Sequence, residues 1–235
     1  MDKLIIKEEC IDTLCDVKYL KLYDLKYREG KHYFDATRRA KADIVAIKSD
    51  EEFRRMLPDA VTIGVVVRLK DEEPKLLLQY EYRYPTGQFL LSPVAGLIDP
   101  EDKEEYEKAV KADAKAENSG LEAAFDNALF SAAKREIHEE TGIEMKATDS
   151  ICVLNPCAFS SPGMTDESNA FLFAEVALDN LDCLNQNGAV GSELFNGFEL
   201  VNKEEARKLY RSGRDKYGNF YSLATWAVLA YFISL

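Results

Sequence analysis

The stretch that decides the fold is Ala132-Ala133-Lys134-Arg135-Glu136-Ile137-His138-Glu139-Glu140-Thr141-Gly142-Ile143. In a helix, Glu136, Glu139 and Glu140 crowd one face, and Gly142 would end that helix. Like charges at this spacing destabilise a helix, so the pattern predicts a cation between them. Magnesium prefers carboxylate oxygens completed by water and phosphate. The other interpretation is an acidic, solvated helix face, opposite an apolar face formed by Phe130, Ala133 and Ile137.

A second motif precedes this stretch, Ala95-Gly96-Leu97-Ile98-Asp99-Pro100. Together with Arg-Glu-X-X-Glu-Glu-X-Gly it resembles the signature of the Nudix hydrolase superfamily, in the form found in its ADP-ribose pyrophosphatase branch. The family's usual spacing would place Arg135 much nearer Gly96, and Asp102 stands where a glutamate is usual. The chain therefore carries an insertion at about 103–127. It is rich in Ala, Glu and Lys, and it predicts one or two surface helices that form a lid, a subunit contact or a tolerated excursion.

The resemblance implies a metal site on the helix expected to end at Gly142, which carries the second half of the signature and is called the box helix below. Two or three Mg²⁺ ions, with Mn²⁺ as an alternative, would be held by Glu136, Glu139, Glu140 and the backbone carbonyl of Ala95. Arg135 would orient the helix carboxylates. The division of the outer glutamates, Glu139 among them, between metal binding and base catalysis stays open. Because Glu140 is expected on a solvated face, its replacement should not unfold the protein.

A loop after the box is expected to supply the general base. Ser160-Ser161-Pro162-Gly163-Met164-Thr165-Asp166-Glu167 contains Pro and Gly and leads into the predicted strand 171–176. It resembles the family's loop that carries a mobile glutamate, used as base or as an additional metal ligand. Glu167 is the residue in that place, and a base on a loop suits a site that closes over substrate.

Three residues are candidates for substrate contacts by the same resemblance. Arg83, in Tyr82-Arg83-Tyr84-Pro85, would bind the diphosphate through its planar guanidinium. Phe34 and an arginine at Arg38 or Arg39 could reach the adenine and phosphate end of a ligand. The alternative is a set of ordinary strand residues. Ser92 occupies a position where this branch usually has a glutamate, which favours a substrate other than ADP-ribose.

The composition narrows the class of protein. The 235 residues carry a net charge of -12 and a pI near 4.8, which argues against a nucleic-acid partner. Five cysteines without zinc-type spacing and only two histidines predict reduced thiols and no histidine-based metal site. The first residues lack the apolar run of a signal peptide, and the apolar stretch 223–235 is too short to span a bilayer. We therefore expect a cytoplasmic protein without a membrane partner.

Periodicity predicts the remaining elements. Residues 19–27 and 32–39 alternate as a hairpin around a turn at 28–31, and residues 60–67 form a strand buried on both faces. A second strand covers 75–85, and others cover 151–154 and 193–201. Residues 50–58 are interpreted as an acidic linker. Asn202 is expected to cap a helix, and 221–235 to form an apolar helix with Trp226 and Tyr231 in the core.

These observations predict an α/β Nudix sandwich, a mixed sheet flanked by helices, with a small N-terminal β-sheet. Residues 1–57 would form that appendage and contribute to a homodimer, and 58–235 the hydrolase domain. The expected function is Mg²⁺-dependent hydrolysis of the diphosphate bond in ADP-ribose or a related nucleotide sugar, giving a nucleoside monophosphate and a sugar phosphate. One alternative is hydrolysis of another nucleotide sugar or dinucleotide. Another is a nucleotide-binding Nudix domain that does not turn over.

Overall fold

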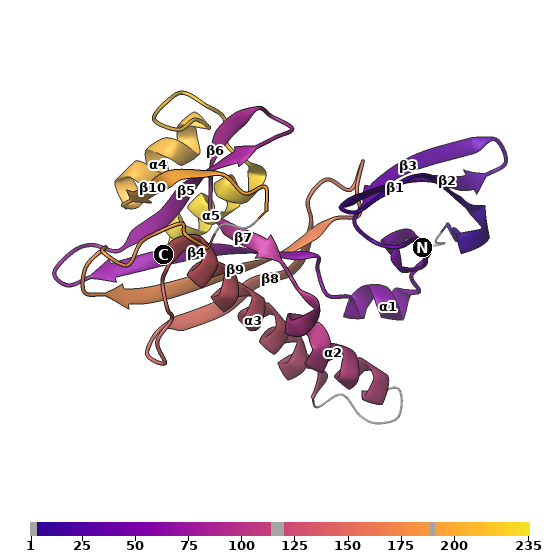
Figure 1. The fold of residues 1–235 in the computed structure, drawn as a ribbon, viewed down its shortest axis with the longest axis horizontal. Helices are drawn as coiled ribbons and strands as arrows, with labels where there is room; N and C mark the ends of the chain where they lie inside the picture. Colours follow the sequence, from indigo (N-terminus) through magenta and orange to yellow (C-terminus); the bar gives the residue numbers. More distant parts are fainter. Residues whose placement is uncertain (1–3, 114–119, 189–190) are drawn as a thin grey trace. The chain divides into compact units, whose positions relative to one another are not determined.

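The computed structural model describes residues 4–113, 120–188 and 191–235, which divide into two compact units (Figure 1). Unit 1 consists of the chain up to Asp59 together with Cys157–Asn169. Unit 2 consists of Ala60–Pro156 and Ala170–Leu235. Unit 1 holds a small antiparallel sheet and unit 2 a larger sheet flanked by helices, so the predicted fold class is confirmed.

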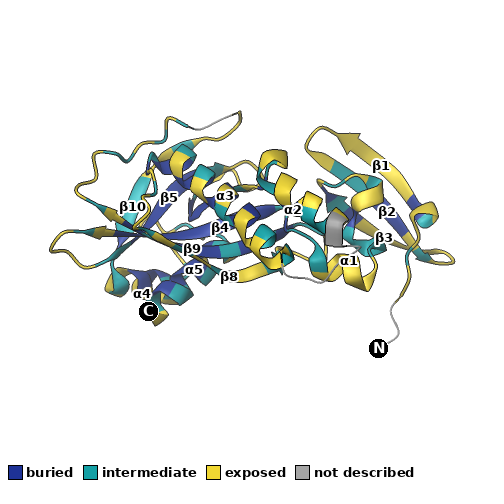
Figure 2. Ribbon diagram, turned by 90° about the horizontal axis from the view of Figure 1, so that it is seen from below, coloured by how far each residue is buried: buried dark blue, intermediate teal, exposed yellow. Residues whose placement is uncertain are grey.

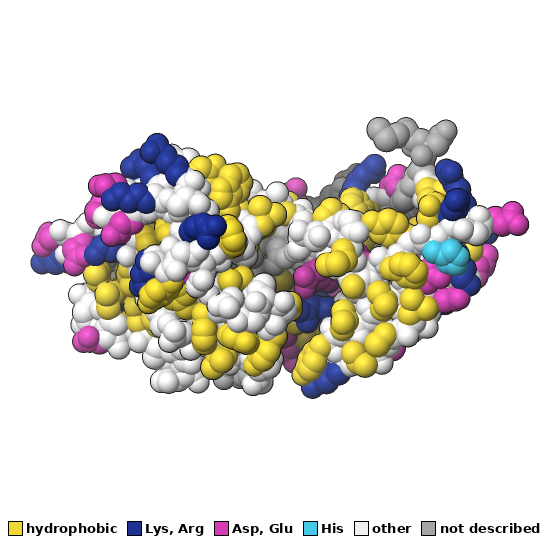
Figure 3. Space-filling view, turned by 90° about the horizontal axis from the view of Figure 1, so that it is seen from above, with side chains coloured by type: hydrophobic (Ala, Val, Ile, Leu, Met, Phe, Trp, Pro, Cys, Tyr) yellow, Lys and Arg dark blue, Asp and Glu magenta, His cyan; other side chains and the backbone are white. Residues whose placement is uncertain are grey.

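Unit 1 is built on a three-stranded sheet in the order β1-β2-β3, formed by β1 (Ile11–Val17), β2 (Leu20–Arg28) and β3 (Lys31–Thr37). The predicted hairpin between β2 and β3 is confirmed, and Gly30 supplies the positive φ of its turn. One face of the sheet packs over a small core made by Ile11, Tyr23, Leu25 and Ile44. Hydrophobic side chains also gather on the outside of this unit (Figure 3); on β1 and β2 they include Leu14, Val17 and Leu20.

The predicted acidic linker after this sheet is wrong, because residues 50–55 form a helix. Three short 3₁₀ helices, η1 (Glu8–Cys10), η2 (Lys41–Asp43) and η3 (Val45–Ile47), come before α1 (Asp50–Arg55). Ser49 caps α1: its hydroxyl accepts from the Glu52 backbone N–H at 3.2 Å, and its own N–H donates to the Glu52 carboxylate at 2.8 Å. This reciprocal capping box stabilises the start of α1. The acidic composition of the segment had favoured a linker instead.

Unit 2 is organised around a mixed seven-stranded sheet with the order β10-β5-β4-β9-β8, in which β6 pairs with β5 and β7 with β4. The strands are β4 (Ala60–Leu69), β5 (Lys75–Arg83), β6 (Gln88–Ser92), β7 (Val94–Leu97), β8 (Ser150–Phe159), β9 (Ser168–Leu178) and β10 (Phe195–Val201). The first eight residues of β4 are buried, as expected for a strand covered on both faces (Figure 2).

Helices lie on both faces of this sheet. On one face, α4 (Lys203–Ser212) and α5 (Leu223–Ser234) cover the even-numbered residues of β5. Asn202 caps α4, as predicted. Because side chains alternate along a strand, the odd-numbered residues of β5 face the other side, where α3 (Leu121–Thr141) packs against β4 and β7. The core on the α5 side contains Leu76, Leu78, Tyr80, Val228, Leu229 and Phe232.

The insertion forms a helical pair with the box helix. The first helix, α2 (Pro100–Asp113), packs on α3, with the rings of Tyr106 and Phe125 5.5 Å apart. The second part of the insertion does not form a separate helix, because α3 runs without a break from Leu121 through Glu136, Glu139 and Glu140 to Thr141. Residues 114–119, which belong to the predicted insertion, lie outside the described residues.

The C-terminal helix corrects one expectation about the core. Trp226 is 42% exposed and stacks on Tyr210 at 4.9 Å, so its predicted core position is wrong. Tyr231 is partly buried and meets Phe173 edge-on at 4.8 Å. None of the helices in the described ranges is both long and apolar enough to cross a membrane.

Candidate active site

The carboxylates of α3 are less exposed than the sequence suggested. Glu136 is 7% and Glu140 4% exposed, so the expectation of a solvated face is wrong for both, while the Glu139 side chain is 37% exposed. The helix ends at Gly142, whose φ of +73° suits glycine and whose N–H bonds to the His138 carbonyl. The buried face of the helix therefore carries acidic side chains as well as the apolar ones that hold it to the sheet.

Arg135 holds the acidic groups together. Its Nη1 donates to Glu136 at 2.7 Å and to Glu139 at 3.2 Å. Its Nη2 donates to Asp102 at 2.9 Å and to the Leu97 carbonyl at 2.8 Å. The guanidinium thereby joins α3 to the end of β7 and the start of α2. Its orienting role in catalysis stays a prediction. Asp102 is held from a second side because the Ser131 hydroxyl donates to it at 2.7 Å.

The glycine of the first motif leaves room for these carboxylates. A Cβ added to Gly96 would lie 2.0 Å from the Glu136 carboxylate, so no larger residue fits without displacing that side chain. The neighbouring Ala95 N–H donates to Glu140 Oε2 at 3.2 Å. The backbone of β7 at Ala95–Gly96 thus lies directly against two of the three carboxylates that are predicted to bind metal. A metal bond to the Ala95 carbonyl stays a prediction.

The electrostatics of the site favour a bound cation. Burial raises the pKa of Glu136 to about 7, although Arg135 opposes the shift. Burial raises the pKa of Glu140 well above its ordinary value, and the charges of Glu81 and Glu136 add to the effect. Carboxylate and carbonyl oxygens suit Mg²⁺ or Mn²⁺. Within the described ranges, however, no three Asp, Glu, His or Cys side chains converge as a ready-made ligand set.

The strand β5 contributes a polar stripe that the sequence analysis did not identify as a unit. Gln79, Glu81 and Arg83 alternate on the α3 side of the sheet. Gln79 is fully buried and donates to Glu140 Oε2 at 2.5 Å. Glu81 is 9% exposed and pairs with Arg83 at 2.5 Å; burial raises the pKa of Glu81, and Arg83 lowers it. The signal available in the sequence was a polar residue at every second position of an otherwise apolar strand.

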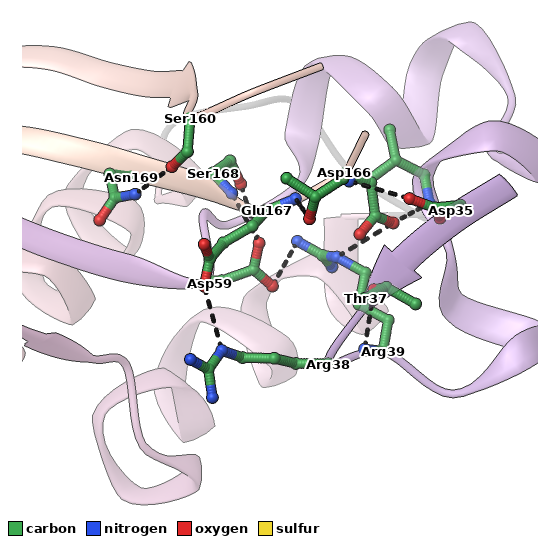
Figure 4. Close-up of polar contacts among 12 residues, drawn as sticks. Asp35, Thr37, Arg38, Arg39, Asp59, Ser160, Asp166, Glu167, Ser168 and Asn169 are labelled. Carbon is green, nitrogen blue, oxygen red and sulfur yellow. Dashed lines mark hydrogen bonds and ion pairs between the residues drawn. The ribbon is translucent and has the colours of Figure 1, made fainter. Parts of the chain in front are cut away.

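The loop that carries Glu167 belongs to unit 1 (Figure 4). Arg38 Nε donates to the Glu167 carboxylate at 3.0 Å, and the Ser160 N–H donates to the Glu167 carbonyl at 2.9 Å. The loop is also held to β3, where the Tyr33 hydroxyl donates to the Gly163 carbonyl at 2.7 Å. Within this unit, Glu167 thus already has a cationic partner on the hairpin.

The other two predicted contacts of unit 1 differ in accessibility. Phe34 is 55% exposed on β3 and available to a ligand. The Arg39 guanidinium is held by Asp59 at 2.8 Å and lies 3.8 Å from Asp166, with 15% of its side chain exposed (Figure 4). A substrate phosphate would have to compete with these two carboxylates. Arg38, the alternative considered from the sequence, has a side chain that is 45% exposed.

The structure therefore gathers most, but not all, of the predicted residues within one unit. Unit 2 holds Arg83, Ala95, Arg135, Glu136, Glu139 and Glu140. Unit 1 holds Phe34, Arg39 and Glu167. The catalytic, metal-binding and substrate-binding roles of the residues in both units stay predictions.

Comparisons with known proteins agree with the expected resemblance to the Nudix hydrolases. No family model matches the sequence. An uncharacterized Nudix hydrolase of Schizosaccharomyces pombe is 30% identical over 129 residues, which cover 55% of this chain and 47% of that protein. The chain thus spans about half the length of this curated relative. The resemblance to the Nudix hydrolases, first seen in the two halves of the signature, is confirmed.

One solved structure supports the fold, and a second is similar over part of the chain. An ADP compounds hydrolase matches 95% of this chain and 91% of its own chain at 15% identity, with a TM-score of 0.51. A Caenorhabditis elegans Ap4A hydrolase matches 74% of this chain and 96% of its own at 17% identity, with a TM-score of 0.42. The first of these likenesses extends over both units and agrees with an α/β sandwich that carries a small additional sheet.

Proposed function

We propose that the protein hydrolyses the diphosphate bond of a nucleoside diphosphate linked to another group, with ADP-ribose or a related nucleotide sugar as substrate. One observation carries the proposal. Glu136 and Glu140 are buried against the glycine-containing backbone of β7, with Glu136 held by Arg135. Such a surplus of buried negative charge is costly unless a cation joins it. A divalent ion with a diphosphate would supply that compensation.

Glu136, Glu139, Glu140 and the Ala95 carbonyl would hold Mg²⁺, or Mn²⁺ in its place. When bound, the metal would offset the charge of the diphosphate and lower the pKa of the attacking water. Arg135 keeps Glu136 and Glu139 in place through two hydrogen bonds from one nitrogen. Its other nitrogen anchors to Asp102 and Leu97, so the carboxylates are oriented before a substrate arrives.

The remaining roles follow from side-chain chemistry. Arg83 would bind the diphosphate, and Glu81 holds its guanidinium at one end. Glu167 would accept the proton of the attacking water as the bridging P–O bond breaks. Phe34 offers an exposed ring for the nucleobase. Arg39, or the more exposed Arg38, would bind a phosphate at the same end.

One feature favours a substrate other than ADP-ribose. Ser92 is 2% exposed and donates to the Leu90 carbonyl at 3.3 Å, so it brings no carboxylate to the α3 side of the sheet. Another nucleotide sugar or a dinucleotide is therefore the second candidate. A domain that binds nucleotides without turnover is the candidate from another class.

A coupled assay tests the proposed function. The full chain is incubated with Mg²⁺ and a panel of ADP-ribose, other nucleotide sugars and dinucleotides, and alkaline phosphatase releases phosphate only from the monoester products. We expect phosphate release that depends on metal, that is lost in Glu140→Gln, and that persists in the exposed control Glu144→Gln. Nucleotide binding without phosphate release from any member of the panel would establish the non-catalytic alternative.

We also propose a homodimer formed through unit 1. The strand β1 lies at the edge of its sheet and exposes apolar residues, including Leu14 and Val17. Exposed edge strands are prone to pair with another chain. Sedimentation of the protein at micromolar concentration should give the mass of two chains, and a stable monomer would reject this assembly.

A further inference from the structure

Two neutral donors approach the carboxylate of Glu140. Gln79 Nε2 donates to its Oε2 at 2.5 Å and the Ala95 backbone N–H donates to the same oxygen at 3.2 Å. Both hydrogen bonds end on one oxygen, which leaves Oε1 outside this arrangement. Arg135 bonds instead to the carboxylates of Glu136 and Glu139. Glu140 is therefore oriented by a mechanism different from that of its neighbours.

The orientation of Gln79 is set by a second glutamine. Gln186, on the segment between β9 and β10, donates from Nε2 to Gln79 Oε1 at 3.2 Å. Gln186 Oε1 in turn accepts from the Gly197 backbone N–H at 3.0 Å. A backbone N–H can only donate, so the oxygen of Gln186 must face it. Its amide nitrogen then faces Gln79, and the nitrogen of Gln79 faces Glu140. The direction of the whole chain of hydrogen bonds is fixed at its far end.

An irregularity in β10 provides that fixed end. The pairing of β10 with β5 shifts register between Phe195 and Phe198, and Gly197 within the shift has φ of +82°. A bulge removes a backbone group from the ladder and turns it elsewhere. Here the Gly197 N–H meets a side chain instead of a strand partner. The segment before β10 is also fastened to the box helix, because the Asn185 N–H donates to the Thr141 carbonyl at 3.0 Å.

We propose that Gln79 and Gln186 are positioning residues that present the Glu140 carboxylate to the metal and diphosphate, acting as a directed relay from the β10 bulge. This inference rests on the proposed function. The relay fixes which oxygen of Glu140 is occupied by the protein and so which one remains for a cation. Neither glutamine touches the substrate. Partners of metal ligands commonly change metal affinity about 10- to 100-fold when they are removed.

The test compares Mn²⁺ binding and turnover in matched variants of the full chain. Gln186→Leu breaks the relay at a partly exposed position, and Asn187→Leu, at the exposed neighbouring amide, is its control. Gln79→Leu breaks the relay in the core, and Gln88→Leu, exposed at the start of β6, is its control. Mn²⁺ affinity is measured without substrate by electron paramagnetic resonance, and thermal unfolding shows whether each variant folds.

We expect Gln186→Leu to weaken Mn²⁺ binding about tenfold and to lower kcat by a similar factor, with the melting temperature close to that of the wild type. Gln79→Leu should have the larger effect. In a Gln79→Leu background, Gln186→Leu should add nothing further to the loss of Mn²⁺ affinity, because it acts only through Gln79. Both control variants should bind Mn²⁺ as the wild type does.

Two outcomes distinguish failure of this inference from failure of the proposed function. If the wild type binds Mn²⁺ and hydrolyses a substrate, but folded Gln186→Leu matches it within twofold in both respects, the relay is overturned and the function stands. If the wild type neither binds Mn²⁺ nor hydrolyses any substrate in the panel, both are overturned. Should Gln79→Leu fail to fold, the Gln186→Leu pair decides alone.

Discussion

Each unit contains an arginine among carboxylates, and the two clusters are arranged differently. In unit 1, Arg39 lies between Asp59 and Asp166, and the nearby Asp35 accepts one hydrogen bond, from the Asp166 N–H at 3.1 Å. Asp35 Oδ2 is buried without a hydrogen-bond partner in the described part of the chain. In unit 2, Arg135 binds several acids, and the acid it does not bind, Glu140, receives two directed N–H donors.

The contrast gives a way to test whether the cluster in unit 2 is the proposed site or an ordinary buried ion cluster. Burial raises the pKa of both Asp35 and Glu140, so a shifted pKa does not distinguish them. The directed donors and the close approach of Gly96 do distinguish them, because both hold carboxylates in defined positions. A raised carboxylate pKa can mark strain or function. Four substitutions, in order of decreasing expected effect, test this distinction.

Glu140→Gln should have the largest effect, because it removes a proposed metal ligand from the cluster with directed donors. The bound metal would stabilise the transition state by several kcal/mol, and loss of that stabilisation corresponds to about a thousandfold lower kcat/KM. Stability should stay equal or rise, since the substitution removes a buried charge. Steady-state kinetics at saturating Mg²⁺ and a thermal melt measure the two. Activity within about threefold of the wild type would show that Glu140 does not bind the metal.

Glu167→Gln should lower kcat roughly a hundredfold, the lower end of the range for proton transfer, and leave KM nearly unchanged. Glu175→Gln, another glutamate paired with an arginine, is the matched control. If Glu167 is instead a metal ligand, raising Mg²⁺ should recover part of the rate. An unchanged kcat would show that the Glu167–Arg38 pair belongs with the structural ion pairs of unit 1, and the base would then lie among Glu136, Glu139 and Glu140.

Gly96→Ala tests the close approach directly. The added methyl would meet the Glu136 carboxylate, and a displaced ligand should lower kcat/KM about tenfold while the flexible side chain absorbs the clash. Gly120→Ala is the control, because a Cβ there meets nothing within 4 Å. Kinetics of the two variants, side by side, measure the effect. Equal activity would mean that Glu136 need not occupy its present position.

Asp35→Asn should leave the chemistry alone and change stability. Burial, followed by the charge of Asp166, raises the pKa of Asp35 to about 6 from 3.8. The folded state therefore binds more protons than the unfolded state between these values, and stability falls as the pH rises from about 4 to 6. The asparagine variant should lose this dependence and be more stable at pH 7, by up to about 3 kcal/mol.

Hydrogen exchange of the β3 amides at pH 5 and pH 7 reports the stability of unit 1 around Asp35. Asp43→Asn, at an exposed position in the same unit, serves as the control. Equal pH dependence in wild type and Asp35→Asn would mean that the carboxylate is better solvated than its burial indicates.

Much of the framework followed from local patterns in the sequence. The box helix with its glycine cap, the buried strand at Ala60, the hairpin around Gly30 and the Asn202 cap were all predicted, because each depends on residues close together in the chain. The capping box formed by Ser49 and Glu52 is equally local and predicts a helix. The run of acidic residues after Ser49 led instead to the incorrect prediction of a linker. That error was avoidable.

The missed features depend on contacts between distant segments. Burial of Glu140 follows from its packing against Gln79 and Ala95, which lie more than forty residues earlier in the chain. The relay through Gln186 needs a bulge whose register no local pattern specifies. Trp226 is exposed because the apolar helix around it is packed on one side only, a fact that composition cannot supply.

The clamp at the base of the insertion suggests a use in protein engineering. Asp102 is bonded to Ser131 and Arg135, one helical turn apart on α3, so α2 is fastened to α3 at this point, and Arg135 also bonds to the Leu97 carbonyl of β7. The first turns of α3 extend the box helix at about 1.5 Å per residue, ahead of the carboxylates at its other end. A foreign domain attached to the helical pair away from Asp102 would therefore leave the residues of the proposed site in place.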